Sequence, residues 1–134
     1  MKSILFLCIA NSARSQMAEG IARRVLGPHV RVQSAGSVPT SVNPMAVKAM
    51  AEVGIDIRGQ KSKSIAEIDL SGVDTVITLC ADEVCPVLPK AVQHVHWPLP
   101  DPAERDRPHN EQILLFREVR DELGKRIREL LVPK

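Results

Sequence analysis

A cysteine near the start of the chain is followed at a fixed interval by an arginine and a serine, in the pattern Cys8-x5-Arg14-Ser15. A cysteine thiolate is a strong nucleophile, and a planar guanidinium can bind two oxygens of a tetrahedral oxyanion. The serine hydroxyl can donate a hydrogen bond to the thiolate. The pattern therefore indicates a nucleophile below a phosphate-like ion. The alternative is an inert thiol at a strand end, since free cysteine is among the most buried residue types.

Two further cysteines, Cys80 and Cys85, are separated by four residues in the second half of the chain. They could form a dithiol pair that carries oxidation away from Cys8, if the segment between them folds back so that the sulfurs meet. They could instead be half of a metal site, or two thiols without a chemical role. Structural zinc takes four ligands and the chain has no second cysteine pair, so we expect no metal and no cofactor.

Other polar residues allow both a chemical and a structural interpretation. Asp101, which precedes a proline, could protonate an oxygen that leaves the attacked oxyanion, but aspartate before proline is also common in turns. His94 and His96 share one face of an expected strand, and nothing nearby completes a metal site. Lys61 and Lys63 are interpreted as a solvated, weakly attractive patch.

The residues around Cys8 predict a strand, a short loop and a helix. The apolar run at positions 4–7 is typical of a buried strand, and apolar residues recur at helical spacing over positions 17–25. Unpaired backbone N–H groups at a helix N-terminus attract anions, and a positive environment favours the thiolate form of a cysteine. The expected oxyanion-binding residues are Ile9, Ala10, Asn11, Ser12, Ala13 and Arg14.

Strand and helix patterns alternate along the rest of the chain. The further elements that we expect are strands near 30–34, 73–79 and 93–97, a helix over 44–53, a short helix after the capping box at 64–67, and a long amphipathic helix over 113–130. This alternation predicts an α/β fold, a small flavodoxin-like doubly wound sheet of four parallel strands with helices on both faces.

The predicted topology brings the candidate residues together. Ligands of such sheets bind beyond the carboxyl ends of the strands. Cys8, Cys80 and the loop that carries Asp101 each follow an expected strand, so all three should meet at that edge.

Composition limits the class of protein. A length of 134 residues suits one domain, 1–134, and a net charge of +2 gives no reason to expect nucleic acid or membrane binding. The chain has two phenylalanines, one tryptophan and no tyrosine, which argues against base stacking. No apolar stretch reaches the ~18 residues that span a bilayer. Three cysteines are too few for a disulfide scaffold, so we expect a cytoplasmic protein with catalytic or redox-active thiols.

The residues that continue the first motif carry a family resemblance. Cys8-x5-Arg14-Ser15 alone is the signature loop of the cysteine phosphatases. Residues 11–20, NSARSQMAEG, make the chain similar to the thioredoxin-coupled arsenate reductases, which share the low-molecular-weight phosphatase fold. The resemblance covers nearly the whole chain and continues through Ser34-Ala35-Gly36, Val42-Asn43-Pro44, residues 52–57, Thr78-Leu79-Cys80, Cys85-Pro86, His96-Trp97 and Asp101-Pro102-Ala103.

The resemblance implies a reaction. Cys8 would attack the arsenic of arsenate held by the loop amides and Arg14, and Asp101 would protonate the leaving oxygen. Cys80 would then attack the Cys8 sulfur, which releases arsenite and forms a Cys8–Cys80 disulfide. Cys85 would resolve that bond and leave a Cys80–Cys85 disulfide for thioredoxin to reduce. Phosphate or sulfate would bind as analogues of arsenate.

The chain differs from the usual family pattern at three places. Ala10 stands where the family usually has glycine, and four residues separate Cys80 from Cys85 instead of the usual six. Some relatives bind potassium near Asn11, Glu19, Ser34 and an aspartate whose position is Lys63 here. We therefore expect the Lys63 ammonium to substitute for the ion and no potassium to bind.

Two other functions remain open at this point. A low-molecular-weight phosphatase that acts on phosphate esters would need Cys8, Arg14 and Asp101 but neither later cysteine. The absence of tyrosine and the presence of Ala103 after Asp101-Pro102 argue against a tyrosine-phosphate specialist, because aromatic side chains usually line that cleft. The third possibility is an oxyanion-binding or redox-sensing module without turnover.

Overall fold

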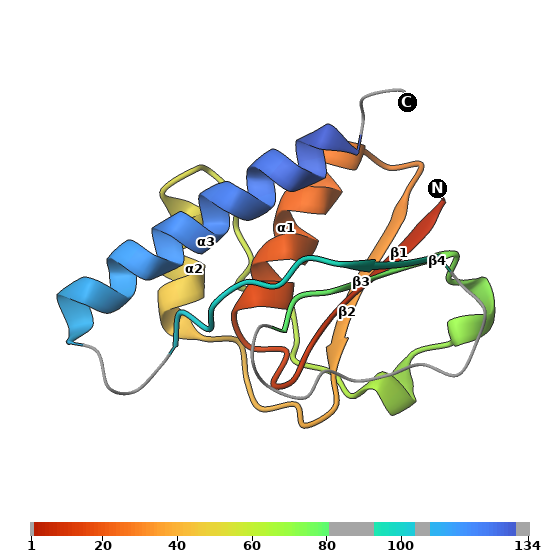
Figure 1. Ribbon diagram of the computed structural model, residues 1–134, viewed down its shortest axis with the longest axis horizontal. Helices are drawn as coiled ribbons and strands as arrows, with labels where there is room; N and C mark the ends of the chain where they lie inside the picture. The colour runs from red at the N-terminus through yellow and green to blue at the C-terminus, as the bar shows by residue number, and fades with distance from the viewer. Residues whose placement is uncertain (1, 81–92, 104–107, 131–134) are drawn as a thin grey trace.

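The computed structural model describes residues 2–80, 93–103 and 108–130 (Figure 1). Its centre is a sheet of four parallel strands in the order β2-β1-β3-β4. The strands are β1 (Ser3–Cys8), β2 (Arg31–Gly36), β3 (Thr75–Thr78) and β4 (Gln93–His96). The helices are α1 (Arg14–Leu26), α2 (Pro44–Ala51) and α3 (His109–Glu129). The predicted α/β fold with four parallel strands is confirmed.

The central strand β1 has no exposed face. Side chains alternate across a strand: Ile4 and Phe6 pack into the core under the three helices, whereas Leu5 and Leu7 pack on the opposite face. Burial on both sides explains why β1 is a continuous apolar run and not an alternating one. Because β1 pairs with a strand on each edge, the loop that follows it lies at the middle of the carboxyl edge of the sheet.

The second face of the sheet carries the smaller part of the core, around Leu5 and Leu7. In the described part of the chain it is covered by two 3₁₀ turns, η1 (Ile65–Glu67) and η2 (Leu70–Gly72), which bring apolar side chains against Leu5 and Leu7. The capping box at Ser64 and Glu67 does form. The expected helix ends after one turn, however, because Ile68 has an extended backbone and Asp69 caps the next turn.

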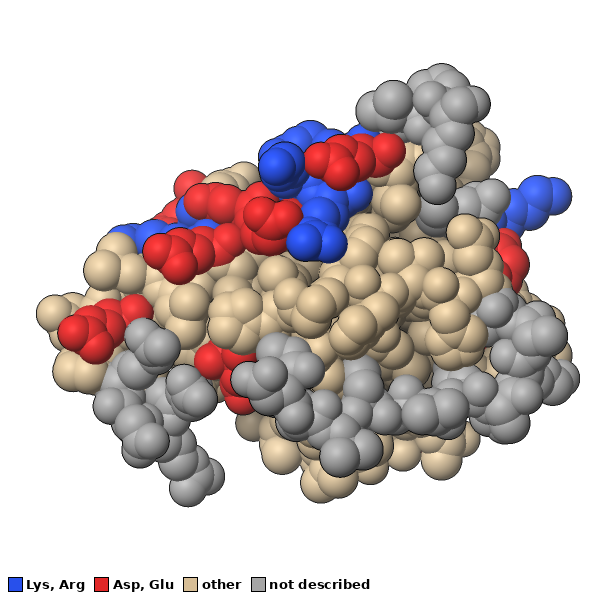
Figure 2. Space-filling view, viewed as in Figure 1, with Lys and Arg blue, Asp and Glu red and all other residues tan. Residues whose placement is uncertain are grey.

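An ion-pair cluster joins the two helices α2 and α3. Glu52, at the C-terminal cap of α2, accepts hydrogen bonds from Arg117 and Arg120 of α3. The bond from Arg117, and then that from Arg120, lowers the pKa of Glu52 from 4.5 to about 2 against the opposing effect of desolvation. In Figure 2 basic and acidic side chains are intermixed along α3.

No helix among the described residues has the length and apolar character needed to cross a bilayer.

Candidate active site

The loop between β1 and α1, residues 9–13, is held in place by hydrogen bonds that surrounding segments donate to its carbonyl oxygens. Each of its five carbonyls accepts a hydrogen bond from a group that is not in the loop. The donors, in loop order, are Val38 N, Thr40 N with Ser62 Oγ, Gln16 Nε2, Asn43 N and Met17 N, at donor–acceptor distances of 2.9 to 3.1 Å. The carbonyls are therefore fixed away from the space that the loop surrounds.

The N–H groups of the same loop are left for a ligand. Within the described part of the chain, no N–H group from Ile9 to Ala13 donates a hydrogen bond. The helix that follows starts at Arg14 with no side-chain cap on its first turn. Unpaired N–H groups at a helix N-terminus favour a bound anion. The predicted strand-loop-helix therefore has the hydrogen-bonding pattern of an anion-binding loop.

A pocket of about 160 Å³ lies over this loop. It is of the size of a small ion with its bound waters. Its lining residues are Cys8, Ile9, Ala10, Ser12, Ala13, Arg14 and Asp101. The structure thus brings together Cys8, Arg14 and Asp101, which are as much as 93 positions apart in the sequence. Asn11, which we expected in the oxyanion-binding set, does not line the pocket and is fully buried behind it.

The direction of the hydrogen bond between Ser15 and Cys8 follows from its neighbours. The Cys8 sulfur lies 2.8 Å from the Ser15 hydroxyl, which in turn accepts a bond of 2.7 Å from the amide nitrogen of Asn11. The backbone N–H of Lys63 can only donate, so its contact with Oδ1 of Asn11 fixes which end of that amide faces Ser15. The hydroxyl of Ser15 is then available to donate a hydrogen bond to the sulfur of Cys8.

The backbone of the loop has two unusual requirements. Asn11 has a φ of 48°, in the left-handed region that asparagine tolerates better than most residues. Gly36, at the end of β2, lies directly behind the loop, and a Cβ there would be 2.3 Å from the carbonyl oxygen of Ile9. Only glycine fits this close approach. Ala10, in contrast, has no positive φ.

Arg14 also connects the loop with two other segments of the site. One nitrogen of its guanidinium, Nη1, donates to the carbonyl of Leu79 at 3.3 Å and to that of Leu99 at 3.0 Å. Leu79 directly precedes Cys80, and Leu99 lies two residues before Asp101. The carboxylate of Asp101 accepts a hydrogen bond from the N–H of Ala103, which limits its orientation.

The second predicted cysteine follows the neighbouring strand. The N–H of Leu79, just after β3, donates to the carbonyl of Leu7 in β1 at 2.9 Å. Cys8 is the residue after Leu7 and Cys80 the residue after Leu79, so the two cysteines follow a hydrogen-bonded pair on adjacent strands. Both are buried; Cys8 is a free thiol, whereas Cys80 is disulfide-bonded. Cys85 lies outside the described residues.

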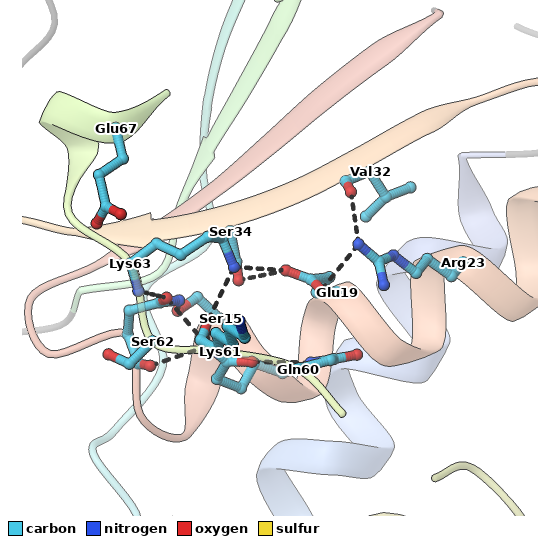
Figure 3. A network of polar contacts seen from close by, with 12 residues as sticks. Ser15, Glu19, Arg23, Val32, Ser34, Gln60, Lys61, Ser62, Lys63 and Glu67 are labelled. Atoms are coloured by element: carbon cyan, nitrogen blue, oxygen red, sulfur yellow. Dashed lines mark hydrogen bonds and ion pairs between the residues drawn. The ribbon is translucent and has the colours of Figure 1, made fainter. Parts of the chain in front are cut away.

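The segment 60–63, which we call the strap, supports the loop from behind, a role that no sequence pattern indicated. All four of its residues form hydrogen bonds with the loop or with the first turn of α1. Such contacts join positions more than 40 residues apart, so no local sequence pattern predicts them. Side chains of Gln60, Ser62 and Lys63 are shown in Figure 3 beside Ser15 and Glu19.

Lys63 is where the sequence-based expectation about solvated lysines is wrong. Its ammonium lies 3.5 Å from Oε1 of Glu19, a residue that is 1% exposed, and the same oxygen accepts a 2.6 Å bond from Ser34 (Figure 3). The ammonium therefore lies where we expected it to substitute for an ion. Lys61, in contrast, is exposed, as expected of a solvated side chain.

The two histidines of β4 are in an ordinary structural setting. Both are exposed, and Nδ1 of His96 lies 2.7 Å from the hydroxyl of Thr78 on the adjacent strand. No group of three metal-binding side chains occurs among residues 2–80, 93–103 and 108–130.

Known proteins resemble the chain over almost its full length. An arsenate reductase of Halalkalibacterium halodurans is 50% identical over 95% of this chain and 93% of its own. A solved structure described as an arsenate reductase in the phosphate binding state has a TM-score of 0.82 at 37% identity, over 97% of this chain and 96% of its own.

A second solved structure, a thioredoxin-dependent arsenate reductase of Corynebacterium glutamicum, has a TM-score of 0.75 at 30% identity and covers 97% of this chain and 60% of its own. The family model for low molecular weight phosphotyrosine protein phosphatases matches residues 3–133. With a cysteine, an arginine and an aspartate around the pocket over one loop, the chain belongs to the low molecular weight phosphotyrosine protein phosphatase family.

Proposed function

We propose that this protein is an arsenate reductase that converts arsenate to arsenite and takes its electrons from thioredoxin. The observation that carries the proposal is the pocket in which Cys8, the anion-binding loop and Asp101 meet, with Cys80 at the end of the adjacent strand. The arsenate reductases that resemble the chain at up to 50% identity, one of them thioredoxin-dependent, support it.

The first step forms a bond between sulfur and arsenic. The thiolate of Cys8 attacks the arsenic of arsenate, while the loop N–H groups and Arg14 hold the other oxygens. One arsenic–oxygen bond breaks, and that oxygen leaves as water with a proton from Asp101. Arsenic is still pentavalent at this stage. Before the attack, Ser15 stabilises the thiolate of Cys8 by donating a hydrogen bond to its sulfur.

The second step transfers two electrons. The thiolate of Cys80 attacks the sulfur of Cys8, so that a sulfur–sulfur bond forms and the sulfur–arsenic bond breaks. The electron pair of the broken bond goes to arsenic, which leaves as trivalent arsenite. Cys85 then attacks the sulfur of Cys80 and frees Cys8 as a thiolate, and thioredoxin reduces the remaining Cys80–Cys85 disulfide. A free Cys8 with a bonded Cys80 is the state expected after Cys8 has been released.

A cytoplasmic location suits this chemistry, because thiols stay reduced there and thioredoxin restores them. The same pocket also favours one second activity, the hydrolysis of small phosphate esters, since Cys8, Arg14 and Asp101 suffice for it. Among the described residues that line the pocket none is aromatic, which argues against a preference for phosphotyrosine.

Turnover of arsenate with thioredoxin, thioredoxin reductase and NADPH tests the proposal. We expect NADPH oxidation that depends on arsenate and is abolished in both Cys80→Ser and Cys85→Ser. The Cys80→Ser variant should stall with arsenic on Cys8, which mass spectrometry would detect. Turnover that survives both changes would exclude the relay, and hydrolysis of p-nitrophenyl phosphate without arsenate turnover would favour the phosphatase.

A further inference from the structure

Gln16, in the first turn of α1, binds three oxygens behind the anion-binding loop. It is fully buried, and its Nε2 lies 3.0 Å from the backbone carbonyl of Asn11, 3.0 Å from Oδ1 of Asn11 and 2.9 Å from the carbonyl of Lys61. Carbonyl oxygens only accept hydrogen bonds, so the amino group of Gln16 must face all three. Its position therefore holds the loop and the strap together.

Gln60 of the strap fixes the other end of the Gln16 amide. Nε2 of Gln60 donates to Oε1 of Gln16 at 2.8 Å and to the backbone carbonyl of Gln16 at 3.0 Å. Oε1 of Gln16 is thus an acceptor, in agreement with the direction set by the three oxygens on its other side. The two glutamines are each held in one orientation by the other.

Gln16, together with the backbone N–H of Lys63 that also donates to Oδ1 of Asn11, determines where Asn11 points. One amino group binds the backbone and the side-chain oxygen of Asn11 at once, which restrains both its left-handed backbone and its side-chain rotamer. Those two settings aim Nδ2 of Asn11 at the Ser15 hydroxyl. Four hydrogen bonds then run in one direction, from Gln60 through Gln16, Asn11 and Ser15 to the sulfur of Cys8.

We propose that Gln16 and Gln60 are positioning residues that set the reactivity of Cys8. Donors aligned in series polarise one another, so each bond strengthens the donation of Ser15 to the thiolate. This inference rests on the proposed function in one respect, that Cys8 is the nucleophile. A role in stability alone is the competing interpretation, because Gln16 also ties two segments of the fold together.

Alkylation of Cys8 by iodoacetamide distinguishes the two roles and requires no arsenate. The Cys80→Ser, Cys85→Ser double variant leaves Cys8 as the one thiol of the chain, so its rate of alkylation can be followed by mass spectrometry from pH 5 to 10. Into this background go Gln16→Met, Gln60→Met and the two together. Methionine keeps the length of glutamine and removes both the donor and the acceptor. Val119→Ala, which truncates a buried side chain of α3 without removing a hydrogen bond, is the control for lost stability.

We expect Gln16→Met to lower the alkylation rate at pH 7 about tenfold and to move the pH at half-maximal rate upward. Gln60→Met should have a smaller effect in the same direction, and the combined variant should react no more slowly than Gln16→Met, because Gln60 acts through Gln16. Val119→Ala should react at the rate of the parent. The proposal is overturned if Gln16→Met is alkylated at the rate of the parent, or if the combined variant is slowed by the product of the two single effects. It is also overturned if Val119→Ala, at a melting temperature equal to that of Gln16→Met, is slowed by as much. Arsenate turnover tests the proposed function separately.

Discussion

Nζ of Lys63 lies 3.5 Å from Oε1 of Glu19, so a lysine of the strap neutralises a carboxylate that is 1% exposed. Two other groups share that carboxylate, the hydroxyl of Ser34 and the guanidinium of Arg23. The pair joins α1 to the segment that holds the loop from behind.

Removal of this ammonium should destabilise the fold. In Lys63→Met, Glu19 keeps Arg23 and Ser34, and the Lys63 side chain is itself 27% exposed, so we expect a loss of about 1–2 kcal/mol in the free energy of unfolding, less than for a fully buried pair. Urea denaturation measures it, with the exposed Lys61→Met as the matched control.

The wild type should melt at the same temperature in potassium chloride and in sodium chloride. A marked stabilisation by potassium would contradict the substitution of the ion by Lys63.

The contact between Gly36 and the loop predicts a sharp difference between two glycines. In Gly36→Ala the new Cβ would lie 2.3 Å from the Ile9 carbonyl and 2.9 Å from the Asn11 nitrogen, so the loop must move. We expect a loss of about 1–3 kcal/mol in stability and a fall of about a hundredfold in arsenate turnover. Gly59→Ala, where nothing lies within 4 Å of a new Cβ, should change neither quantity. Equal behaviour of the two variants in denaturation and turnover assays would show that the close approach is unimportant.

Asp101→Asn should separate binding from catalysis. Asparagine keeps the acceptor for the Ala103 N–H but has no acidic proton, so the leaving oxygen loses its proton donor. We expect arsenate turnover to fall by about 10²–10³, while the melting temperature and the affinity for phosphate, measured by calorimetry, stay near those of the wild type. Asp56→Asn, at an exposed aspartate paired with Arg58, is the control. Retained turnover in Asp101→Asn would remove the aspartate from the mechanism.

The Glu52 cluster makes part of the stability dependent on pH. Its pKa is about 2 in the folded chain and ordinarily 4.5, mainly because Arg117 donates a hydrogen bond to it. The folded state therefore binds this proton more weakly than the unfolded state, and the contribution to stability is complete above pH 4.5 and lost as the pH falls toward 2.

Glu52→Gln should accordingly melt below the wild type at pH 7, and the difference should shrink between pH 4.5 and 2. Thermal unfolding followed by circular dichroism at several pH values measures this. Glu118→Gln, on the exposed face of α3, should show no such convergence. A difference that stays constant down to pH 2 would mean that Glu52 does not act through its charge.

The sequence was sufficient for those parts of the site that lie close together in it. Cys8, Arg14 and Ser15 fall within eight residues, and the apolar run before them and the helical spacing after them predict the turn that brings them together. Asp101 could be placed near Cys8 because both follow parallel strands, whose carboxyl ends share one edge.

What could not be predicted depends on contacts between distant segments. The strap, Gln16 and the role of Gly36 involve hydrogen bonds or close approaches that leave no local pattern. Charge alone suggested that Lys63 is solvated, whereas the family resemblance placed it near Glu19, where the structure has it. The short helix predicted after Ser64 forms as a single 3₁₀ turn, Ile65–Glu67; a capping box specifies where a helix begins and not how far it continues.

The outward fixing of all five loop carbonyls has a consequence for selectivity. Because its surroundings already hold the loop in shape, the loop needs little rearrangement to accept an ion, and it recognises charge and tetrahedral geometry. Phosphate and arsenate are alike in both respects, so binding alone gives this protein little means to choose between them. Under the proposed function the choice is kinetic: phosphate would occupy the loop as a reversible competitor, and arsenic would be distinguished by its ability to take an electron pair from sulfur.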